Sequence, residues 1–183
     1  MQPPTRKTPR LLLRRFALAD APRLHELAAD YDIAAMTLTM PYPYPEGAAE
    51  AFIDKVRQSW DEGTDYVFAI VPHGEPQLIG CIGIHPSPAH RRAELGYWMG
   101  RSYRGQGLMT DAVRRVIQFG FDELGLNRIY AASFGSNPAS MRVLEKVGMT
   151  REGTLRQHFV RFGQLQDGVY YSILRGEWAS PAI

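Results

Sequence analysis

The chain has 183 residues, of which 45% are hydrophobic and 22% are charged, and its formal net charge is +2. These ordinary values, together with the length, predict a single globular domain over residues 1–183 with its core at about 11–178. The small charge gives no reason to expect direct nucleic-acid binding. No apolar run approaches the roughly 20 residues that span a bilayer, so we expect no membrane segment.

The N-terminal part of the chain predicts a strand and a helix. Residues 11–16, three leucines followed by two arginines and a phenylalanine, are interpreted as a strand. Asp20 suits the N-cap of a helix that tolerates Pro22 in its first turn, and its apolar stripe extends to Tyr31. The proline-rich segment 41–45 excludes a helix because residues before proline are pushed to extended geometry.

The middle of the chain predicts a helix followed by strands. Apolar residues at steps of four over 48–60 indicate an amphipathic helix. The runs 66–71 and 78–84 flank a turn rich in glycine and proline, which is typical of a hairpin. Residues 92–99 continue the sheet with a further strand.

The C-terminal part alternates helices and strands. Apolar spacing predicts a long helix over 109–124, which Gly125 ends, and then a strand over 128–134. Two further strands, 149–155 and 168–174, close the sheet. The fold class is therefore α+β, with a mixed sheet flanked by helices.

The most informative stretch, 98–110, is a glycine-rich turn between a predicted strand and an amphipathic helix. Glycines let the backbone approach a ligand, and the first helical N–H groups have no internal partner. The helix dipole favours an anion there, and Arg101 and Arg104 add cations that we expect to be mobile. The turn lacks the Gly-Lys-Ser/Thr of a P-loop, and Thr110 replaces the third glycine of a dinucleotide fingerprint. It still predicts a cradle for phosphates.

The order of the motifs resembles the GNAT superfamily of N-acetyltransferases, in its ribosomal-protein branch. Arg104-Gly105-Gln106-Gly107 is similar to the second half of the Gln/Arg-x-x-Gly-x-Gly/Ala motif that binds acyl-coenzyme A, although Ser102 departs from the motif's first position. The resemblance extends over about 11–178 and is strongest over 93–156. It implies a GNAT-like mixed sheet, acetyl-coenzyme A as cosubstrate and, from the family alone, a homodimer.

The resemblance also implies where acetyl-coenzyme A would lie. The pantetheine arm would run between two splayed central strands beside Tyr97, Trp98 and Met99, with the Met99 N–H facing the thioester oxygen. The pyrophosphate would meet the turn and the start of the next helix. The cofactor residues implied there are Arg104, Gly105, Gln106, Gly107, Leu108, Met109 and Thr110.

Three residues of the next predicted helix have both a structural and a functional interpretation. Asn137 suits an N-cap before Pro138, in a helix that Gly148 ends, and the resemblance adds a hydrogen bond to the pantetheine. Ser140 is either a plain first-turn serine or, by resemblance, the acid that protonates the departing thiolate. Lys146 is either a solvated lysine or a partner of a cofactor phosphate.

Glu94 is the candidate base. By strand alternation it shares a face with Gly96 and Trp98, and its alternative role is an ion pair with Arg91 or Arg92. At pH 7.4 a lysine-like amine, with a pKa of about 10.4, costs about 4 kcal/mol to deprotonate, whereas an α-amine costs under about 1 kcal/mol. A base therefore matters more for a lysine, polyamine or aminoglycoside than for a protein N-terminus.

Cysteine and histidine usage argues against metal and covalent chemistry. Cys81 is the only cysteine, which excludes an intrachain disulfide, favours a reducing cytoplasm and suggests a small buried side chain. Two of the five histidines, His85 and His90, flank the loop of residues 86–88, and the other three are scattered. No cluster has metal-ligand spacing. We predict no metal and no covalent intermediate.

The acceptor amine is the least determined part. Tyr42 and Tyr44 lie in a stiff aromatic loop that the resemblance places near the acceptor cleft, and 156–161 approaches it from the C-terminal half. The alternatives are a protein N-terminus, a small-molecule amine, and a non-catalytic sensor of acyl-coenzyme A. A nucleotide-binding protein is disfavoured by the missing Gly-Lys-Ser/Thr.

Overall fold

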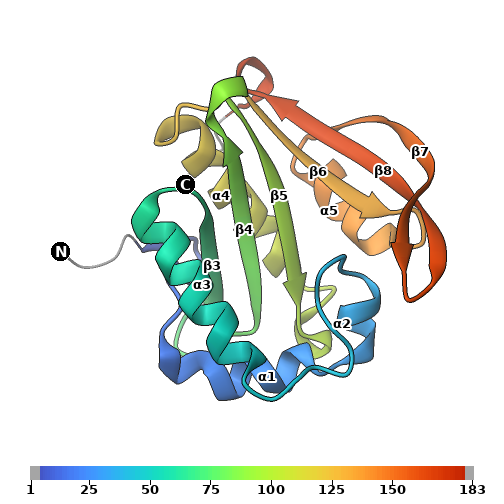
Figure 1. The fold of residues 1–183 in the computed structure, drawn as a ribbon. Coiled ribbons are helices and arrows are strands. Elements are labelled where there is room, and N and C mark those ends of the chain that lie inside the picture. The colour runs from blue at the N-terminus through green and yellow to red at the C-terminus, as the bar shows by residue number, and fades with distance from the viewer. Residues whose placement is uncertain (1–4, 180–183) are drawn as a thin grey trace.

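The computed structural model describes residues 5–179, which form one eight-stranded sheet in the order β1-β2-β3-β4-β5-β6-β8-β7 (Figure 1). The strands are β1 (Arg6–Lys7), β2 (Leu11–Arg14), β3 (Tyr66–Pro72), β4 (Gly80–Ser87), β5 (Arg92–Met99), β6 (Arg128–Phe134), β7 (Thr150–Arg161) and β8 (Gln164–Leu174). The helices are α1 (Ala21–Ala28), α2 (Tyr31–Ala35), α3 (Ala48–Glu62), α4 (Leu108–Asp122) and α5 (Pro138–Lys146). Neighbouring strands are antiparallel except for β5 and β6, which are parallel.

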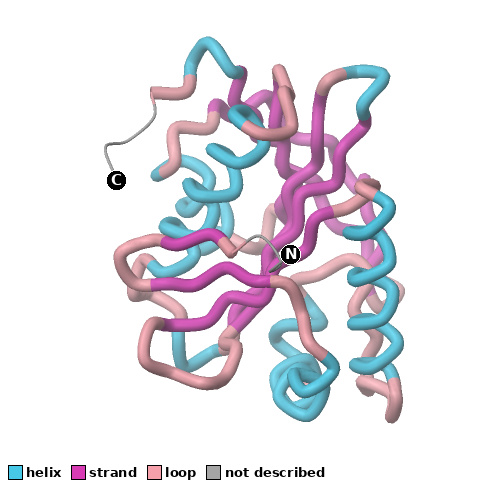
Figure 2. Tube along the Cα trace, turned by 90° about the vertical axis from the view of Figure 1, so that its left-hand side faces the viewer, coloured by secondary structure: helices cyan, strands magenta, loops and turns pink. Residues whose placement is uncertain are grey.

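Helices cover both faces of the sheet, as Figure 2 shows. Alternation along β3 explains this: Phe68 and Ile70 pack into the core that includes α4, whereas Val67 and Ala69 pack into the core that includes α1 and α3. The predicted α+β class and the mixed sheet flanked by helices are therefore confirmed.

The parallel pair in the middle of the sheet is short. β5 and β6 pair only between Arg92–Glu94 of β5 and the start of β6, whereas β6 pairs with β8 along its full length. Beyond Glu94 the two strands separate, as the diverging arrows in Figure 1 show. Residues 95–99 therefore have a strand partner on one edge only, which is β4.

Two expectations for the first helix are wrong in detail. The apolar stripe does not continue to Tyr31, because α1 ends at Ala28, and Tyr31 begins α2 with half of its surface exposed. Asp20 stands at the N-cap of α1, but its side chain makes no cap hydrogen bond. Its two carboxylate oxygens instead accept from Arg14 at 2.7 and 2.8 Å. The guanidinium gives the carboxylate two parallel bonds from an opposite charge, where a helix cap would offer a backbone N–H.

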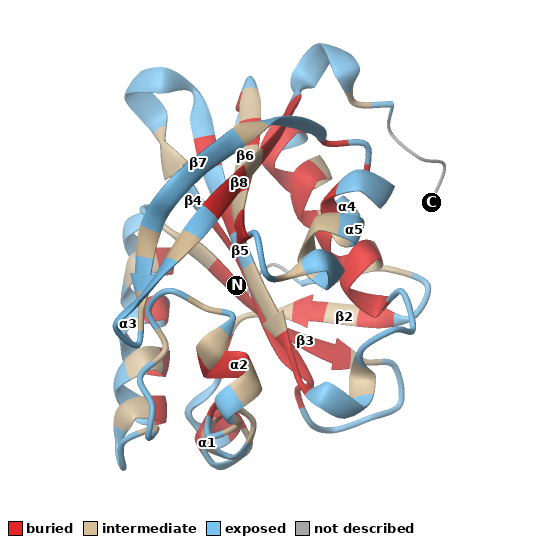
Figure 3. Ribbon diagram, turned by 90° about the vertical axis from the view of Figure 1, so that its right-hand side faces the viewer, coloured by how far each residue is buried: buried red, intermediate tan, exposed pale blue. Residues whose placement is uncertain are grey.

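The last hairpin is longer than the sequence predicted. β7 runs on to Arg161 and β8 begins at Gln164, joined by Phe162 and Gly163, which both have positive φ. The added segment is largely exposed on both faces and its register is irregular before Phe159, so it carries no clear period-2 pattern (Figure 3).

Candidate active site

A cleft of about 900 Å³ opens where β5 and β6 separate. Its walls on the cofactor side come from β5, the turn before α4, β6 and α5. On the other side they come from α3, the segment 36–41 and β4. The sequence-predicted residues that line it are Glu94, Tyr97, Trp98, Met99, Arg104, Gly105, Gly107, Leu108, Met109, Thr110, Asn137, Ser140 and Lys146.

The edge of β5 presents unpaired backbone donors to this cleft. The Gly100 N–H donates to the Ile79 carbonyl at 2.9 Å, on the β4 side of the strand. Because successive residues of a strand face alternate edges, the N–H groups of Tyr97 and Met99 point the other way, into the gap beside β6. An extended chain with amide groups can hydrogen-bond to this edge as an added strand would.

The start of α4 offers a second set of donors. Gly107 is its N-cap with φ of 76°, a left-handed conformation that favours glycine, and no side chain caps the helix. The N–H groups of Leu108, Met109 and Thr110 therefore face the turn without a capping partner. Because these three side chains are buried, what they offer an anion is backbone and helix dipole.

Both arginines of the turn have partners in the folded chain. Arg101 pairs with Asp32 and lies 3.5 Å from Asp30, at the start of α2. The Arg104 Nε donates to the Met99 carbonyl at 2.9 Å. The Arg104 side chain also lines the cleft.

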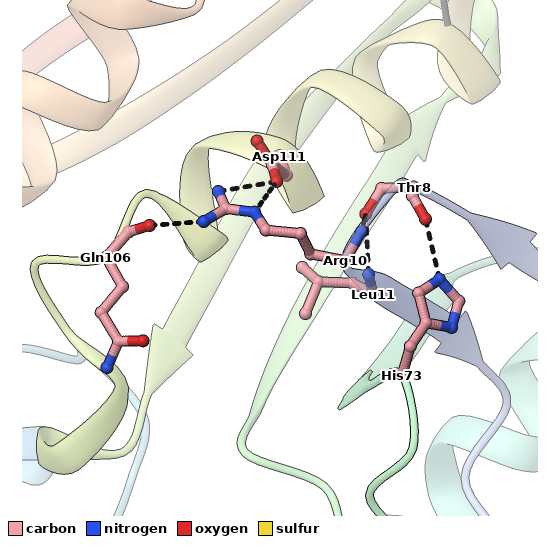
Figure 4. Close-up of polar contacts among 6 residues, drawn as sticks. All are labelled: Thr8, Arg10, Leu11, His73, Gln106 and Asp111. Carbon is pink, nitrogen blue, oxygen red and sulfur yellow. Dashed lines mark hydrogen bonds and ion pairs between the residues drawn. The ribbon is translucent and has the colours of Figure 1, made fainter.

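Gln106 does not line the cleft, although its neighbours on both sides do. Its carbonyl accepts from Arg10 at 2.7 Å, and the Arg10 guanidinium also pairs with Asp111 at 2.8 Å (Figure 4). A Cβ on Gly107 would lie 3.2 Å from Arg10 Nη2. Arg10 therefore braces the phosphate turn from outside the cleft, a contact that no local motif signals.

Asn137, Ser140 and Tyr97 form a small network at the base of the cleft. Asn137 Oδ1 accepts from the Ser140 N–H at 3.1 Å, which confirms the predicted N-cap and leaves the Asn137 amide N–H groups available. The Tyr97 hydroxyl donates to the Ser140 carbonyl at 3.2 Å and lies 3.0 Å from Ser140 Oγ. Burial raises the pKa of Tyr97 to about 12, so the phenol stays protonated at neutral pH.

Two cations on α5 face the cofactor side of the cleft. Lys146 lines it together with Arg142, which the sequence analysis did not select. Both side chains are exposed, and they stand on the last two turns of the helix. The spacing of four residues places them on one helix face, and that spacing is the signal that would have identified Arg142.

The other half of the cleft is built mainly from side chains. Gly83 of β4 and Gly96 of β5 are directly paired and line the floor of the cleft, where neither contributes a side chain. Phe52 and Lys55 of α3 form one wall. Glu94 lies exposed at the end of this floor, and its carboxylate is 3.5 Å from the hydroxyl of Tyr130.

Glu94 forms no ion pair with Arg91 or Arg92 among the described residues. Its carboxylate is therefore open to the cleft. The structural alternative considered for it, an ion pair with the neighbouring arginines, is wrong.

Arg161 connects the end of β7 to residues 34–40, on the side of the cleft formed by the segment 36–41. Its guanidinium donates to the carbonyl of Ala34 at 2.5 and 2.9 Å, to that of Leu38 at 3.2 Å, and to that of Met40. The same guanidinium stacks 3.9 Å from the centre of the Phe162 ring. Residues more than 120 positions apart are thereby fixed side by side.

Within residues 5–179, no group of three or more His, Cys, Asp or Glu side chains is placed to hold a metal ion. None of the helices described is long and apolar enough to cross a membrane.

Cys81 is buried, as predicted, and burial raises the pKa of its thiol to about 12, which makes it an unreactive side chain.

The match to a known family decides the identity. Residues 10–150 match the family model described as an acetyltransferase (GNAT) domain. The chain belongs to the GNAT acetyltransferase family. It is 30% identical to the N-acetyltransferase YnaD of Bacillus subtilis, over 93% of this chain and 97% of that protein. It is also 26% identical to the spermidine N(1)-acetyltransferase of Escherichia coli, over 91% of this chain and 87% of that protein.

Solved structures agree with the GNAT assignment. An acetyltransferase of the GNAT family from Bacillus anthracis superposes with a TM-score of 0.85 at 29% identity, covering 95% of this chain and 100% of that one. RimL, a ribosomal L7/L12 α-N-protein acetyltransferase solved with coenzyme A, shares the fold with a TM-score of 0.86 at 19% identity, over 93% and 98% of the two chains. The match to the family confirms the predicted family, the enzyme class and the use of acetyl-coenzyme A.

The GNAT cleft has the groups that acetyl-coenzyme A requires. The β5 edge offers N–H donors to an amide-bearing arm, the start of α4 offers donors and a favourable dipole to a pyrophosphate, and Arg142 and Lys146 supply positive charge. These groups surround the same opening from adjacent elements. When bound, the cofactor supplies the activated acetyl group as a thioester.

Proposed function

We propose that this GNAT enzyme acetylates a single primary amine and that the α-amine at a protein N-terminus is its acceptor. The observation that carries this proposal is the sparse negative charge of the cleft. Among the described lining residues, the only carboxylates are Asp65 and Glu94, and Asp65 is paired with His85 at 2.8 Å. Lys55 adds a positive charge to the same wall.

This charge distribution disfavours a polyamine acceptor. A polyamine carries several ammonium groups, and each one that is buried without a carboxylate loses its hydration uncompensated. Glu94 offers one ammonium group a partner, and the other walls are largely apolar. The proposal therefore follows the activity printed for RimL and not that of the spermidine enzyme, to which the chain is also similar.

The proposed reaction is a direct attack. The Glu94 carboxylate pairs with the ammonium group and accepts a proton from its nitrogen, and that nitrogen forms a bond to the thioester carbon. The Met99 N–H stabilises the oxyanion. As the C–S bond breaks, Ser140 Oγ gives a proton to the thiolate and recovers one from solvent, with the Tyr97 hydroxyl as its partner at 3.0 Å.

The acceptor is tested by thiol release from acetyl-coenzyme A with a panel of amines. The panel contains a peptide with a free N-terminus, the same peptide N-terminally blocked but with a lysine, spermidine and an aminoglycoside. We expect the free N-terminus to exceed the others by at least about tenfold in kcat/KM. Preference for spermidine or the aminoglycoside would replace the proposed acceptor with a small molecule. Cofactor binding without turnover on any amine would indicate a sensor.

The acid is tested with Ser140→Ala. We expect kcat to fall by about 10²-fold, which is the lower end of the effect of general acid catalysis. The effect is small because the pKa of the thiol is about 8.5, so the thiolate leaves readily. The KM for acetyl-coenzyme A should stay within about twofold. Ser136→Ala is the matched control, since Ser136 precedes the same helix but bonds to Gln166 outside the cleft. An unchanged kcat in Ser140→Ala would remove Ser140 from the mechanism.

We also propose a cellular compartment and an oligomeric state for the enzyme. The single buried cysteine fits a reducing cytoplasm. A homodimer is expected from the family resemblance, and light scattering coupled to size-exclusion chromatography tests it directly.

A further inference from the structure

The acceptor end of the cleft holds a second pair of titratable groups. His85 is near the end of β4, and Asp65 immediately precedes β3. The His85 Nδ1 lies 2.8 Å from Asp65 Oδ1, and the side chains are 44% and 37% exposed. Both residues line the cleft. In the sequence, His85 is one of two histidines that flank the loop of residues 86–88, and nothing nearby in the chain pairs it with Asp65.

The other ring nitrogen of His85 lies over the bare floor. A Cβ built on Gly83 would lie only 2.8 Å from His85 Nε2 and 3.2 Å from its Cε1. Glycine at position 83 therefore makes room for the imidazole in this orientation. Gly96, directly paired with Gly83, has no atom within 4 Å of its own Cβ position, so the space beside the ring is open. Nε2 has no hydrogen-bond partner among residues 5–179.

His85 and Glu94 are direct cross-strand neighbours. They are paired in the register of β4 and β5, and they stand on the same face as Gly83 and Gly96. The charged groups that line the floor with them are Asp65, on the far side of the ring, and Lys55 of α3. An ammonium group that reaches Glu94 therefore lies beside the imidazole.

We propose that His85, oriented by Asp65, is a second proton acceptor for the amine, beside Glu94. Asp65 accepts the Nδ1–H, which fixes the tautomer and leaves the Nε2 lone pair facing the cleft. This inference rests on the proposed N-acetyltransferase reaction at the same site. It assigns a catalytic role to an imidazole–carboxylate pair that local sequence does not reveal.

His85, Glu94 and Ser140 account for every proton that moves in this step. Nε2 takes one proton from the ammonium group, giving a neutral amine and an imidazolium that Asp65 stabilises. The amine nitrogen forms the C–N bond to the thioester carbon, and the nitrogen of this tetrahedral intermediate gives its second proton to the Glu94 carboxylate. As the C–S bond breaks, the thiolate takes a proton from Ser140 Oγ, which recovers one from solvent. No oxidant or further reactant is needed.

The test uses the full-length enzyme and the amine that turns over best in the panel. The variants are His85→Ala, Asp65→Asn and Glu94→Gln, with His90→Ala as the matched control, because His90 is exposed and outside the cleft. At about pH 6.5, where an α-amine is largely protonated, we expect His85→Ala to lower kcat/KM for the amine by about 10²-fold. We expect Asp65→Asn to lower it by about tenfold, and the KM for acetyl-coenzyme A to be unchanged.

Chemical rescue separates catalysis from structure. Added imidazole should raise the rate of His85→Ala by about tenfold or more and should not change the rate of Glu94→Gln. Only the His85→Ala variant has an imidazole-sized space over Gly83. The loss in His85→Ala should also shrink above the pKa of the amine, where no ammonium remains to be deprotonated.

Two results would overturn the inference, and each differs from failure of the proposed function. If His85→Ala keeps the wild-type rate at both pH values, His85 is not a proton acceptor. If it loses rate without imidazole rescue and equally at both pH values, its role is structural. Failure of the proposed function appears in the wild-type enzyme itself, as the absence of turnover with every amine.

Discussion

The two halves of the cleft are built in opposite ways. The half in which we propose that the cofactor binds comes from consecutive elements, β5, α4, β6 and α5, and it offers mostly backbone N–H groups. The half proposed for the acceptor joins α3, the segment 36–41, β4 and the β7–β8 hairpin, and it offers side chains. A backbone site depends on local conformation, which short motifs encode, whereas a side-chain site depends on which distant segments meet.

The same difference explains how each half is held. In the cofactor half, Arg10 braces a turn whose shape the glycines already favour. In the acceptor half, Arg161 joins the β7–β8 hairpin to residues 34–40, two segments that lie far apart in the sequence. Disturbing each half should therefore affect one substrate and spare the other.

The largest effect is expected at the N-cap of α4. In Gly107→Val, a β-branched residue cannot adopt φ near 76° without strain, and its side chain meets Arg10. We expect the affinity for acetyl-coenzyme A, measured by calorimetry, to fall by about 10²-fold. Gly47→Val is the matched control, because Gly47 caps α3 with φ of 77° and nothing lies within 4 Å of its Cβ position.

The control should lose similar stability but keep its cofactor affinity. Equal loss of affinity in both variants would mean that Gly107 acts only through folding, and the contrast between the two halves would fail.

Removing the Arg161 contacts should affect the acceptor half alone. In Arg161→Ala, three carbonyls lose a charged donor, a kind of bond that contributes about 1.5–3 kcal/mol. We expect a loss of about 2 kcal/mol in unfolding free energy and an increase of about tenfold in the KM for the amine. The KM for acetyl-coenzyme A should not change.

Arg156→Ala, on an exposed part of the same strand, is the control for Arg161→Ala. An equal rise in both KM values for Arg161→Ala would show that the two halves are coupled through the hairpin.

Loss of the Arg10 brace should have a smaller effect, on the cofactor side. Arg10 is 46% exposed, and an exposed ion pair contributes about 1 kcal/mol at most. We expect Arg10→Ala to raise the KM for acetyl-coenzyme A by about threefold to fivefold with kcat unchanged. Lys7→Ala, an exposed cation on β1, should have no effect. A change confined to the KM of the amine would contradict the assignment of Arg10 to the cofactor half.

The smallest effect concerns Glu152, at the start of β7. Hydrogen bonds from Arg128 and then from Ser172 lower its pKa to about 2. The folded-state pKa lies below the ordinary value of 4.5, so this stabilisation is present above about pH 4.5 and is lost as the pH falls to about 2. The side chain is 40% exposed, so solvent screening holds the contribution below about 1 kcal/mol.

Urea unfolding of Glu152→Gln and wild type should therefore differ at pH 7 and converge near pH 2. Glu75→Gln, in an exposed turn, should match wild type at both pH values. A difference that persists at the lower pH would mean that packing, and not charge, holds the start of β7.

The sequence by itself determined the bounds of β5 and β6 and the helix that Asn137 caps, because each depends on residues within a few positions of one another. It also identified the glycine turn. These features follow from periodicity, capping and backbone freedom, which are local properties. The family and its mixed sheet were predicted from the resemblance of the motifs and their order.

Tertiary structure alone decided the rest. It pairs Arg101 with Asp32, extends the last hairpin, and brings Asp65 and His85 together beside Glu94. Contacts between segments far apart in the chain depend on how twisted strands and helices pack, and no single stretch of sequence specifies that packing. The acceptor site belongs to this second class, since its side chains meet only after the sheet has formed.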